Sequence, residues 1–478
     1  MDLRSTFEVF VSADEIPSSI VENTTLDHTA AVDTVIERPP QSLQRRVIGL
    51  AAPVIGENLL HTLLGVVDTL LVAGLGAVAL AGVGTALQVI FVLIAALTAL
   101  SVGASVLVAQ AVGAADLAAA NRYARQALIW SIIVSVPFSL LGLLLSPSII
   151  GLLGVATDVA QIAMAYLYVT IGTISTILVL LIGGGVLRGA GDSRTPMLIT
   201  AFANVINIGL SYVLIYGHLG FPMLGAVGSA WGTFLSRLLG AILLLAVLWH
   251  GRHGVRIGGP GTWRPQFGVA RNVLRVGLPA AIEQIVIITA FAVLTPIVAG
   301  LGTAALAAHR VVINVLSLSF LPGIGFGLAA TALVGQSIGA QRPDEARAIT
   351  TIALRWAMLW MGALGILFLF FATQLMRLFT DDPAMIASGA AGIRTVALAQ
   401  PIWAGTFVFA GALRGTGNTR TPLLITSIAT WSVVGLGYLA VRFWHPSLAA
   451  IWGAFLVIGP LEVIAFWWAW RQWFPTTR

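Results

Sequence analysis

Three ionisable side chains occupy the first apolar segment of the chain, where a charged group in hydrocarbon costs at least ~2.5 kcal/mol. They are Glu57, His61 and Asp68. On a helix, which turns by about 100° per residue, the three lie within about 40° of one another along about 16 Å of the axis. Such a narrow stripe predicts an internal cavity and not a lipid-facing surface.

Asp68 is the first candidate for chemistry within this stripe. A carboxyl group that is shielded from water can alternate between a protonated and an ionised form, which is what a proton-coupled carrier requires. The alternative is that Asp68 only hydrogen-bonds neighbouring helices or reaches the membrane interface. For His61, a purely structural role is equally compatible with the sequence.

Glu57 and Glu283 stand in corresponding positions, each four residues after a proline, Pro53 or Pro279. Proline lacks an N–H group and permits a helix to bend. A bend in the first helix would couple protonation of Asp68 to substrate release, with a static kink as the alternative. We favour a structural or gating role for the two glutamates over transport coupling, and Glu283 marks a polar site in the second half.

The composition requires lipid as the main solvent of these residues, since 58% of the 478 residues are hydrophobic and only 9% are charged. Apolar stretches of roughly 20 residues, the length of a membrane-spanning helix, recur along the chain. No alternating strands typical of a β-barrel are found. The predicted all-α membrane protein has twelve helices, near 47–73, 79–111, 122–146, 159–187, 196–217, 225–250, 274–299, 305–336, 348–372, 386–413, 422–443 and 448–471.

The segments around these helices differ in composition. Eight of the 19 acidic residues fall within the first 40 positions, and no basic start precedes an apolar run there, so we predict a disordered polar tail over residues 1–45 and no signal peptide. A stretch rich in Gly and Arg separates the two sets of helices. The predicted boundaries are 46–250 for the first half, 251–270 for a linker and 271–478 for the second half.

The two halves are copies of one another. One constant shift places PVIGENLL, from Pro53, on PAAIEQIV, from Pro279, and LRGAGDSRTPMLIT, from Leu187, on LRGTGNTRTPLLIT, from Leu413. With six helices each, the copies have the same orientation in the membrane. Parallel repeats of this kind are typical of transporters, with the binding site between the halves near mid-membrane.

The orientation in the membrane follows from the arginines, which make up all 25 basic residues. Nearly all loop arginines fall on one side of a twelve-helix arrangement, and the opposite loops carry only Arg377 and Arg442. The positive-inside rule therefore predicts that both termini are cytoplasmic in a plasma or inner membrane. The same rule accounts for the formal net charge of +6 without nucleic acid. In the LRG loops, the arginines are read as topology signals.

Several function classes are excluded by what the sequence lacks. There is no cysteine, and the glycines at 183–185 are not followed by Gly-Lys-Ser/Thr, so neither a thiolate metal site nor an ATP-binding loop is indicated. No paired acidic motif for a metal-bound diphosphate is present. We therefore predict a protein that is no enzyme and has neither cofactor nor metal.

Taken together, the motifs resemble the multidrug and toxic compound extrusion (MATE) family, and in particular its DinF-like branch, from about residue 45 to the C-terminus. The resemblance implies a V-shaped bundle of two six-helix lobes that exports amphipathic, often cationic, compounds in exchange for H⁺ or Na⁺. The motifs that carry it are PVIGENLLHTLLGVVDTLLVAGLG, LVAQAVGA, LRGAGDSRTP, LAAHRVVINV, LVGQSIGA and LRGTGNTRTP.

The resemblance also assigns residues of the first lobe. Asp68 matches the cation-coupling aspartate of that lobe, and Asn207 matches a polar residue on the fifth helix. The acidic residue often found four positions later is Ser211 here. With one carboxylate fewer, H⁺ is the simpler coupling ion and Na⁺ the alternative. Thr233, on the sixth helix, is a further candidate member of the cavity.

The sequence thus predicts a proton-coupled exporter of small organic cations or drugs that works by alternating access. Membrane lipids are its surroundings, and a complete two-half carrier can act as a monomer. The alternative is a flippase for lipid-linked or other amphipathic precursors, for which more basic residues in the cavity and additional helices are typical. A membrane receptor or enzyme would need an extramembrane domain or a catalytic constellation.

Overall fold

The computed structural model describes residues 42–444 and 446–473, so most of the predicted tail lies outside the described residues. Within these ranges the chain forms thirteen α-helices. Their bounds are α2 (Leu43–Ala73), α3 (Ala77–Gly113), α4 (Leu117–Leu152), α5 (Thr157–Gly172), α6 (Ile174–Gly189), α7 (Arg194–Tyr216), α8 (Ala226–His250), α9 (Phe267–Ala299), α10 (Thr303–Gly339), α11 (Pro343–Arg377), α12 (Pro383–Gly415), α13 (Arg420–Phe443) and α14 (Leu448–Trp473).

The helices are those of a membrane protein. Eleven of the described helices are long and apolar enough to cross a membrane, and the bent pair α5–α6 raises the number to twelve. Large apolar side chains such as Leu144, Val205 and Phe370 are exposed on the outer surface, where lipid replaces water as the neighbour. The predicted all-α fold with twelve spans is confirmed.

One predicted helix, 159–187, is broken. α5 and α6 meet at Thr173 at an angle of 51°. No proline lies at the break, but three threonine hydroxyls turn back onto backbone carbonyls: Thr170 to Tyr166, Thr173 to Val169 and Thr176 to Thr173. Such bonds compete with the helical ladder and bend helices. Periodicity of apolar residues does not reveal a break of this kind.

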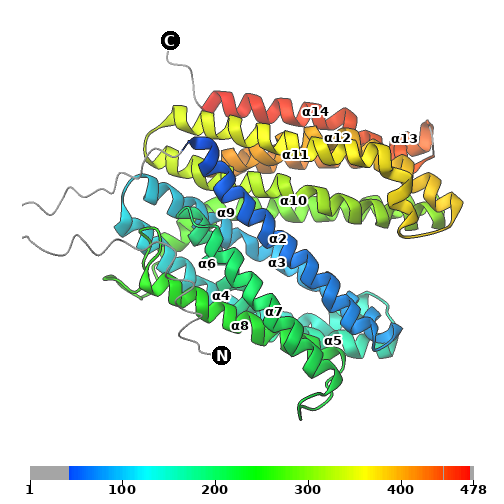
Figure 1. The fold of residues 1–478 in the computed structure, drawn as a ribbon, viewed down its shortest axis with the longest axis horizontal. Coiled ribbons are helices and arrows are strands. Elements are labelled where there is room, and N and C mark those ends of the chain that lie inside the picture. The colour runs from blue at the N-terminus through cyan, green and yellow to red at the C-terminus, as the bar shows by residue number, and fades with distance from the viewer. Residues whose placement is uncertain (1–41, 445, 474–478) are drawn as a thin grey trace, which may run out of the picture.

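The helices form two halves, with α4–α8 below and α10–α14 above in Figure 1, and α2 runs obliquely between them. The first turns of α2 pack into the core of the second half, where Val47 is fully buried. The first turns of α9 pack into the core of the first half through Val273, the repeat equivalent of Val47. The two lobes are therefore pseudo-symmetric and exchange the beginnings of their first helices.

The segment between the lobes is held against the first one. Val255 and Ile257 are buried in the first-lobe core, and the guanidinium of Arg125 donates hydrogen bonds to the carbonyls of Ile257 and Gly259, both at 3.1 Å. α9 begins at Phe267, inside the segment predicted to be linker. These contacts fix the direction in which α9 enters the bundle.

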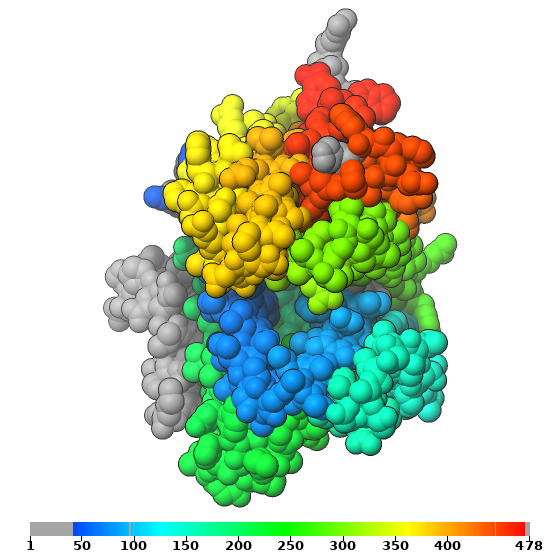
Figure 2. All heavy atoms as spheres, turned by 90° about the vertical axis from the view of Figure 1, so that its right-hand side faces the viewer, coloured from blue at the N-terminus to red at the C-terminus, as the bar shows by residue number. Residues whose placement is uncertain are grey.

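The two ends of the bundle differ. α2 begins and α14 ends at the same end, on the left in Figure 1. The opposite end is hollowed between the lobes, and α2 and α3 border the hollow from the first lobe (Figure 2). At the end where α2 begins, the glycine-rich ends of α3 and α10 close the space between the lobes.

Candidate functional site

Asp68 lies on α2 and turns toward α5 and α8 of the first lobe. One oxygen of its carboxyl group, Oδ1, is buried and accepts no hydrogen bond from any described residue. Ser229 of α8 faces it, but its hydroxyl is also without a hydrogen-bond partner among the described residues. Buried polar atoms are usually satisfied, so an orphaned carboxyl oxygen marks a place where a proton or an ion can bind.

A half-buried arginine shares this environment. Arg237 stands in the middle of α8, within electrostatic range of Asp68 and of the buried Tyr166 of α5. A cation at that depth is costly and is normally balanced by an anion. Asp68 and Arg237 thus place opposite charges within electrostatic range of each other among α2, α5 and α8, and we call this region the chamber of the first lobe.

Glu57 and His61 extend the stripe along α2 below Asp68. Glu57 Oε2 accepts a hydrogen bond from the guanidinium of Arg188 on α6 at 3.0 Å. His61 is solvent-accessible, yet Glu57, Arg188 and Arg237 all lie within electrostatic range of it. Glu57 and His61 therefore share charged neighbours of the first lobe, and the internal cavity along the stripe stays a prediction.

Three further candidates lie together in a second polar group. Asn207 Nδ2 donates to Thr233 Oγ1 at 3.0 Å and to Ser236 Oγ at 3.2 Å, and Ser211 Oγ donates to Asn207 Oδ1 at 3.3 Å. All four side chains are buried. Thr233 is separated by one helical turn from Ser229 on one side and from Arg237 on the other. One face of α8 therefore connects this group with the surroundings of Asp68.

α7 holds α2 in register with the site. Three side chains donate to carbonyls of α2: Ser193 to Leu50 at 2.9 Å, Asn204 to Leu60 at 2.8 Å and Tyr216 to Leu71 at 2.8 Å. The three acceptors are spaced at about three helical turns. The helix that carries Asp68 is therefore fastened along most of its length to the first lobe.

The second lobe contains its own charged group around Glu283. Glu283 Oε1 accepts from the guanidinium of Arg414 at 2.8 Å and from Thr426 Oγ1 at 3.2 Å, whereas its Oε2 is buried without a partner among the described residues. A second carboxyl group, Glu462 of α14, lies within electrostatic range of Glu283. The pair Glu283–Arg414 repeats the pair Glu57–Arg188 of the first lobe.

The prolines assigned to helix bending lie inside unbroken helices. α2 continues through Pro53 and α9 through Pro279, so neither proline ends its helix. Within residues 42–444 and 446–473, no group of three His, Cys, Asp or Glu side chains is placed to hold a metal ion.

The end of the bundle opposite the hollow is closed by a symmetric contact, which we call the glutamine clasp. Gln110 of α3 donates to the carbonyl of Gly415 at 3.0 Å, and Gln336 of α10 donates to the carbonyl of Gly189 at 2.9 Å. A Cβ atom on Gly113 would lie 1.9 Å from the carbonyl oxygen of Gln336. The motifs VAQAVGA and VGQSIGA therefore bring the lobes into backbone contact.

Sequence reasoning missed four charged residues of these sites: Arg188 and Arg414, which were read only as topology signals, and Arg237 and Glu462. The signal for the last two was present, since each lies within a predicted apolar span. An ionisable residue at such a position indicates a functional partner. The pairing of Arg188 with Glu57 was beyond reach because it depends on how α6 packs on α2.

Comparison with known proteins agrees with this architecture. The MatE family pattern matches residues 53–213 and again residues 279–439, which are related by the same shift as the two repeats. The probable multidrug resistance protein NorM of Thermotoga maritima is 33% identical over 416 residues, which cover 86% of this chain and 88% of that protein.

Solved structures are similar over nearly the whole bundle. A multidrug resistance MATE family transporter of the MOP superfamily in its outward-facing conformation has a TM-score of 0.84 and 25% identity, over 90% of this chain and 95% of that one. A MATE protein in a bent conformation gives the same TM-score, identity and coverage. The chain therefore belongs to the MATE family of multidrug efflux transporters.

Proposed function

We propose that this protein exports amphipathic, often cationic, small molecules in antiport with H⁺, as a monomer, with Asp68 as the group that carries the proton. The observation that supports this most directly is the enclosed carboxyl oxygen of Asp68, which has no hydrogen-bond partner among the described residues. When the chamber opens to the outside, Asp68 takes up a proton and the substrate leaves. When it opens to the cytoplasm, the proton is released and new substrate enters.

Arg237 supports H⁺ over Na⁺ as the coupling ion. A sodium ion needs several oxygen ligands and would have to share the chamber with a fixed guanidinium. A proton only neutralises Asp68. The neighbouring polar group offers hydroxyl and amide oxygens but no second carboxylate, since Ser211 stands where the family often has an acidic residue.

The first test replaces Asp68 by asparagine. In proteoliposomes with an imposed pH gradient, Asp68→Asn is expected to lose at least nine-tenths of the uptake of fluorescent organic cations, because the amide cannot carry the proton. Asp68→Glu is expected to retain part of it. The matched control is Asp158→Asn, which removes an exposed carboxylate at the start of α5. Undiminished H⁺-driven uptake by Asp68→Asn would remove this residue from the mechanism.

The second test concerns the ion. A Na⁺ gradient imposed without a pH gradient is expected to drive no uptake by the native chain. In Arg237→Gln, we expect H⁺-driven uptake to fall and Na⁺-driven uptake to appear, because the fixed cation no longer repels Na⁺. Sodium-driven uptake by the native chain would contradict the assignment of H⁺.

One observation favours the flippase alternative. Arg237 is a basic residue inside the chamber, and such a residue can bind the anionic headgroup of a lipid precursor. A flippase would translocate a fluorescent lipid between the leaflets of the same proteoliposomes. Lipid translocation without export of organic cations would decide for this alternative.

We further propose that the arginine-rich end faces the cytoplasm, so that both termini are cytoplasmic. Because the chain has no cysteine, single cysteines report the topology without background. Leu219→Cys, in the α7–α8 connection, is expected to react with an impermeant maleimide in intact cells. Arg342→Cys, between α10 and α11, is expected to react only after the cells are opened. The reverse pattern would invert the proposed orientation.

A further inference from the structure

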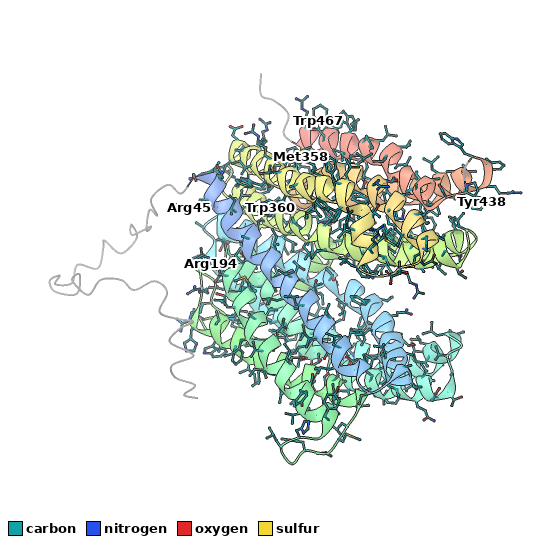
Figure 3. All side chains as sticks on the ribbon, turned by 45° about the vertical axis from the view of Figure 1, so that its right-hand side comes forward. Arg45, Arg194, Met358, Trp360, Tyr438 and Trp467 are labelled. Atoms are coloured by element: carbon teal, nitrogen blue, oxygen red, sulfur yellow. The ribbon has the colours of Figure 1, made fainter. Side chains whose placement is uncertain are left out.

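A cavity of about 680 Å³ opens where α2 and α7 begin. Its two cationic side chains, Arg45 and Arg194, come from the first turns of the two helices and lie at the same end of the molecule (Figure 3). The volume falls in the range of pockets that hold a small ligand or part of a larger one. This cavity is separate from the chamber around Asp68.

The two arginines are not neutralised by the described part of the chain. Other arginines at this end have acidic partners: Arg46 pairs with Glu345, Arg188 with Glu57 and Arg252 with Asp192. Arg45 and Arg194 are exposed and make no ion pair with any residue of the ranges 42–444 and 446–473. The N-termini of α2 and α7 add partial positive charge. The mouth of the cavity is therefore suited to an anion.

The remainder of the cavity is apolar. Its walls include Ile48, Ala52 and Pro53 of α2 and Met197 of α7. Pro53 lies about 12 Å along the axis from Arg45. On α7, the next residue after Met197 is Leu198, which is exposed on the outer surface of the bundle. The cavity thus changes from cationic to apolar along the direction in which a membrane helix enters lipid.

We propose that this cavity binds an anionic phospholipid, with the phosphate headgroup between Arg45 and Arg194 and the beginning of an acyl chain against Ile48, Pro53 and Met197. Basic pockets between membrane helices recognise such headgroups. Paired guanidinium groups bind a phosphate through charge-assisted hydrogen bonds. The tail of residues 1–41 also combines acidic with apolar residues. The lipid is the better match because the apolar wall continues toward Leu198, on the lipid-facing surface of the bundle.

The repeat supplies an internal comparison. Arg271 and Arg420 are the counterparts of Arg45 and Arg194 in the second half. At the walls, however, Gly49 is replaced by Arg275 and Ala52 by Leu278. We expect these larger side chains to reduce the space that the small residues leave open in the first half. The second half therefore retains the two cations without the apolar space, and only the first is expected to bind the lipid.

Occupation of the cavity would connect the two lobes. The first turns of α2 belong to the core of the second lobe, through Val47 and the ion pair of Arg46 with Glu345. α7 belongs to the first lobe. A lipid phosphate held by both arginines would therefore stabilise the closed state of the end at which the glutamine clasp lies.

The test uses a single cysteine in the full-length chain, which contains none of its own. Gly49→Cys is suitable because a Cβ atom at this position meets no other atom within 4 Å. In nanodiscs that contain phosphatidylglycerol, its reaction with a maleimide is expected to be at least fivefold slower than in phosphatidylcholine alone. Adding Arg45→Gln and Arg194→Gln is expected to remove this protection.

Matched variants separate the lipid from other causes. Arg271→Gln with Arg420→Gln removes the same charge and is expected to leave the protection at Gly49→Cys unchanged. Arg275→Cys, at the position equivalent to Gly49, is expected to show less than a twofold effect of phosphatidylglycerol.

Three results would overturn the proposal. Equal protection by inorganic phosphate would indicate a site for a free anion. Protection that persists without Arg45 and Arg194 would exclude them as the headgroup ligands. Slow labelling in phosphatidylcholine that phosphatidylglycerol does not change would indicate that the chain's own tail fills the cavity.

Discussion

The first and second lobes share a scaffold but differ in the residues that face their interiors. The ion pairs Glu57–Arg188 and Glu283–Arg414 are repeat equivalents, with N–O distances of 3.0 Å and 2.8 Å. The position of Asp68, in contrast, is occupied in the second lobe by Leu294, which is buried in its core. Contacts that hold helices together were kept after duplication, whereas the chamber was not.

The same divergence is found on the last helix of each lobe. When Trp231 and Gly232 of α8 are placed on Trp452 and Gly453 of α14, Arg237 corresponds to Ile458. The second lobe instead has Glu462, near Glu283. The first lobe balances a carboxyl group with a half-buried cation, and the second places two carboxyl groups within electrostatic range of each other. The repeat therefore determines the geometry of the bundle but not its chemistry.

The largest loss of transport is expected from substitutions at the glutamine clasp, where the two lobes are most alike. Gly113→Ala and Gly339→Ala each place a Cβ atom 1.9 Å from a backbone oxygen, of Gln336 and Gln110 respectively. Neither lobe core is disturbed, but this end cannot close completely. We expect both variants to lose at least nine-tenths of the transport rate in proteoliposomes.

The control for the clasp is Gly362→Ala on α11, where an added Cβ atom meets nothing within 4 Å. It is expected to transport normally. If Gly113→Ala and Gly339→Ala differ strongly in rate, the two halves of the clasp are not equivalent and the symmetry argument fails at this point.

Breaking either of the two ion pairs is expected to have a smaller effect, which is a loss of stability. The size of this loss should differ between the lobes. The Glu283 side chain is 3% exposed, whereas that of Glu57 is 14% exposed. Breaking a buried ion pair costs about 3–5 kcal/mol because a charge is left without its partner. Glu283→Gln should therefore lower the unfolding midpoint of the purified protein clearly more than Glu57→Gln. Equal losses would mean that exposure does not distinguish the pairs.

Much of the fold was predictable from the sequence because membrane helices are set by long apolar segments and the duplication by a constant shift. The stripe of Glu57, His61 and Asp68 was also within reach, since it depends only on helical geometry. The break at Thr173 was not, because side-chain hydrogen bonds to the backbone leave the apolar pattern unchanged. The first turns of α2 and α9 each pack into the core of the other lobe. This arrangement depends on tertiary packing, which the apolar periodicity does not encode.

The residues of the candidate site could be predicted from the sequence, whereas most of the contacts between them could not. Asn207, Ser211 and Thr233 were named from the resemblance, and the structure brings them into one hydrogen-bonded group. Their mechanistic roles stay predictions. Arg237 was missed because the positive-inside argument counts arginines in loops, and this one lies inside a helix.

The smallest change in stability is expected from substitutions in the loops before α7 and α13. These two loops differ by one charge. Asp192 accepts hydrogen bonds from Thr195 N at 3.0 Å and Thr195 Oγ1 at 2.6 Å. Its counterpart Asn418 accepts a hydrogen bond from Thr421 N at 3.1 Å but donates one from Nδ2 to Thr421 Oγ1 at 2.9 Å. Burial raises the pKa of Asp192, but the hydrogen bonds from Thr195, the electrostatic effect of His253 and the hydrogen bond from Arg252 outweigh it and hold this pKa below its usual range.

Asp192→Asn makes the first loop like the second and is expected to cost about 1 kcal/mol of stability, because the amide loses the charge that binds Arg252. Because the pKa of the native carboxyl group is lowered by folding, its contribution is complete above the unfolded value of about 4 and is lost as the pH falls through the folded value. The difference in unfolding midpoint between native and variant protein should thus be constant from pH 5 to pH 8 and shrink in more acidic buffers. Asn418→Asp, which retains the acceptor for Thr421 N, should change the midpoint by less than half as much. A penalty for Asp192→Asn that is largest at acidic pH would show that the carboxylate is not the stabilising form.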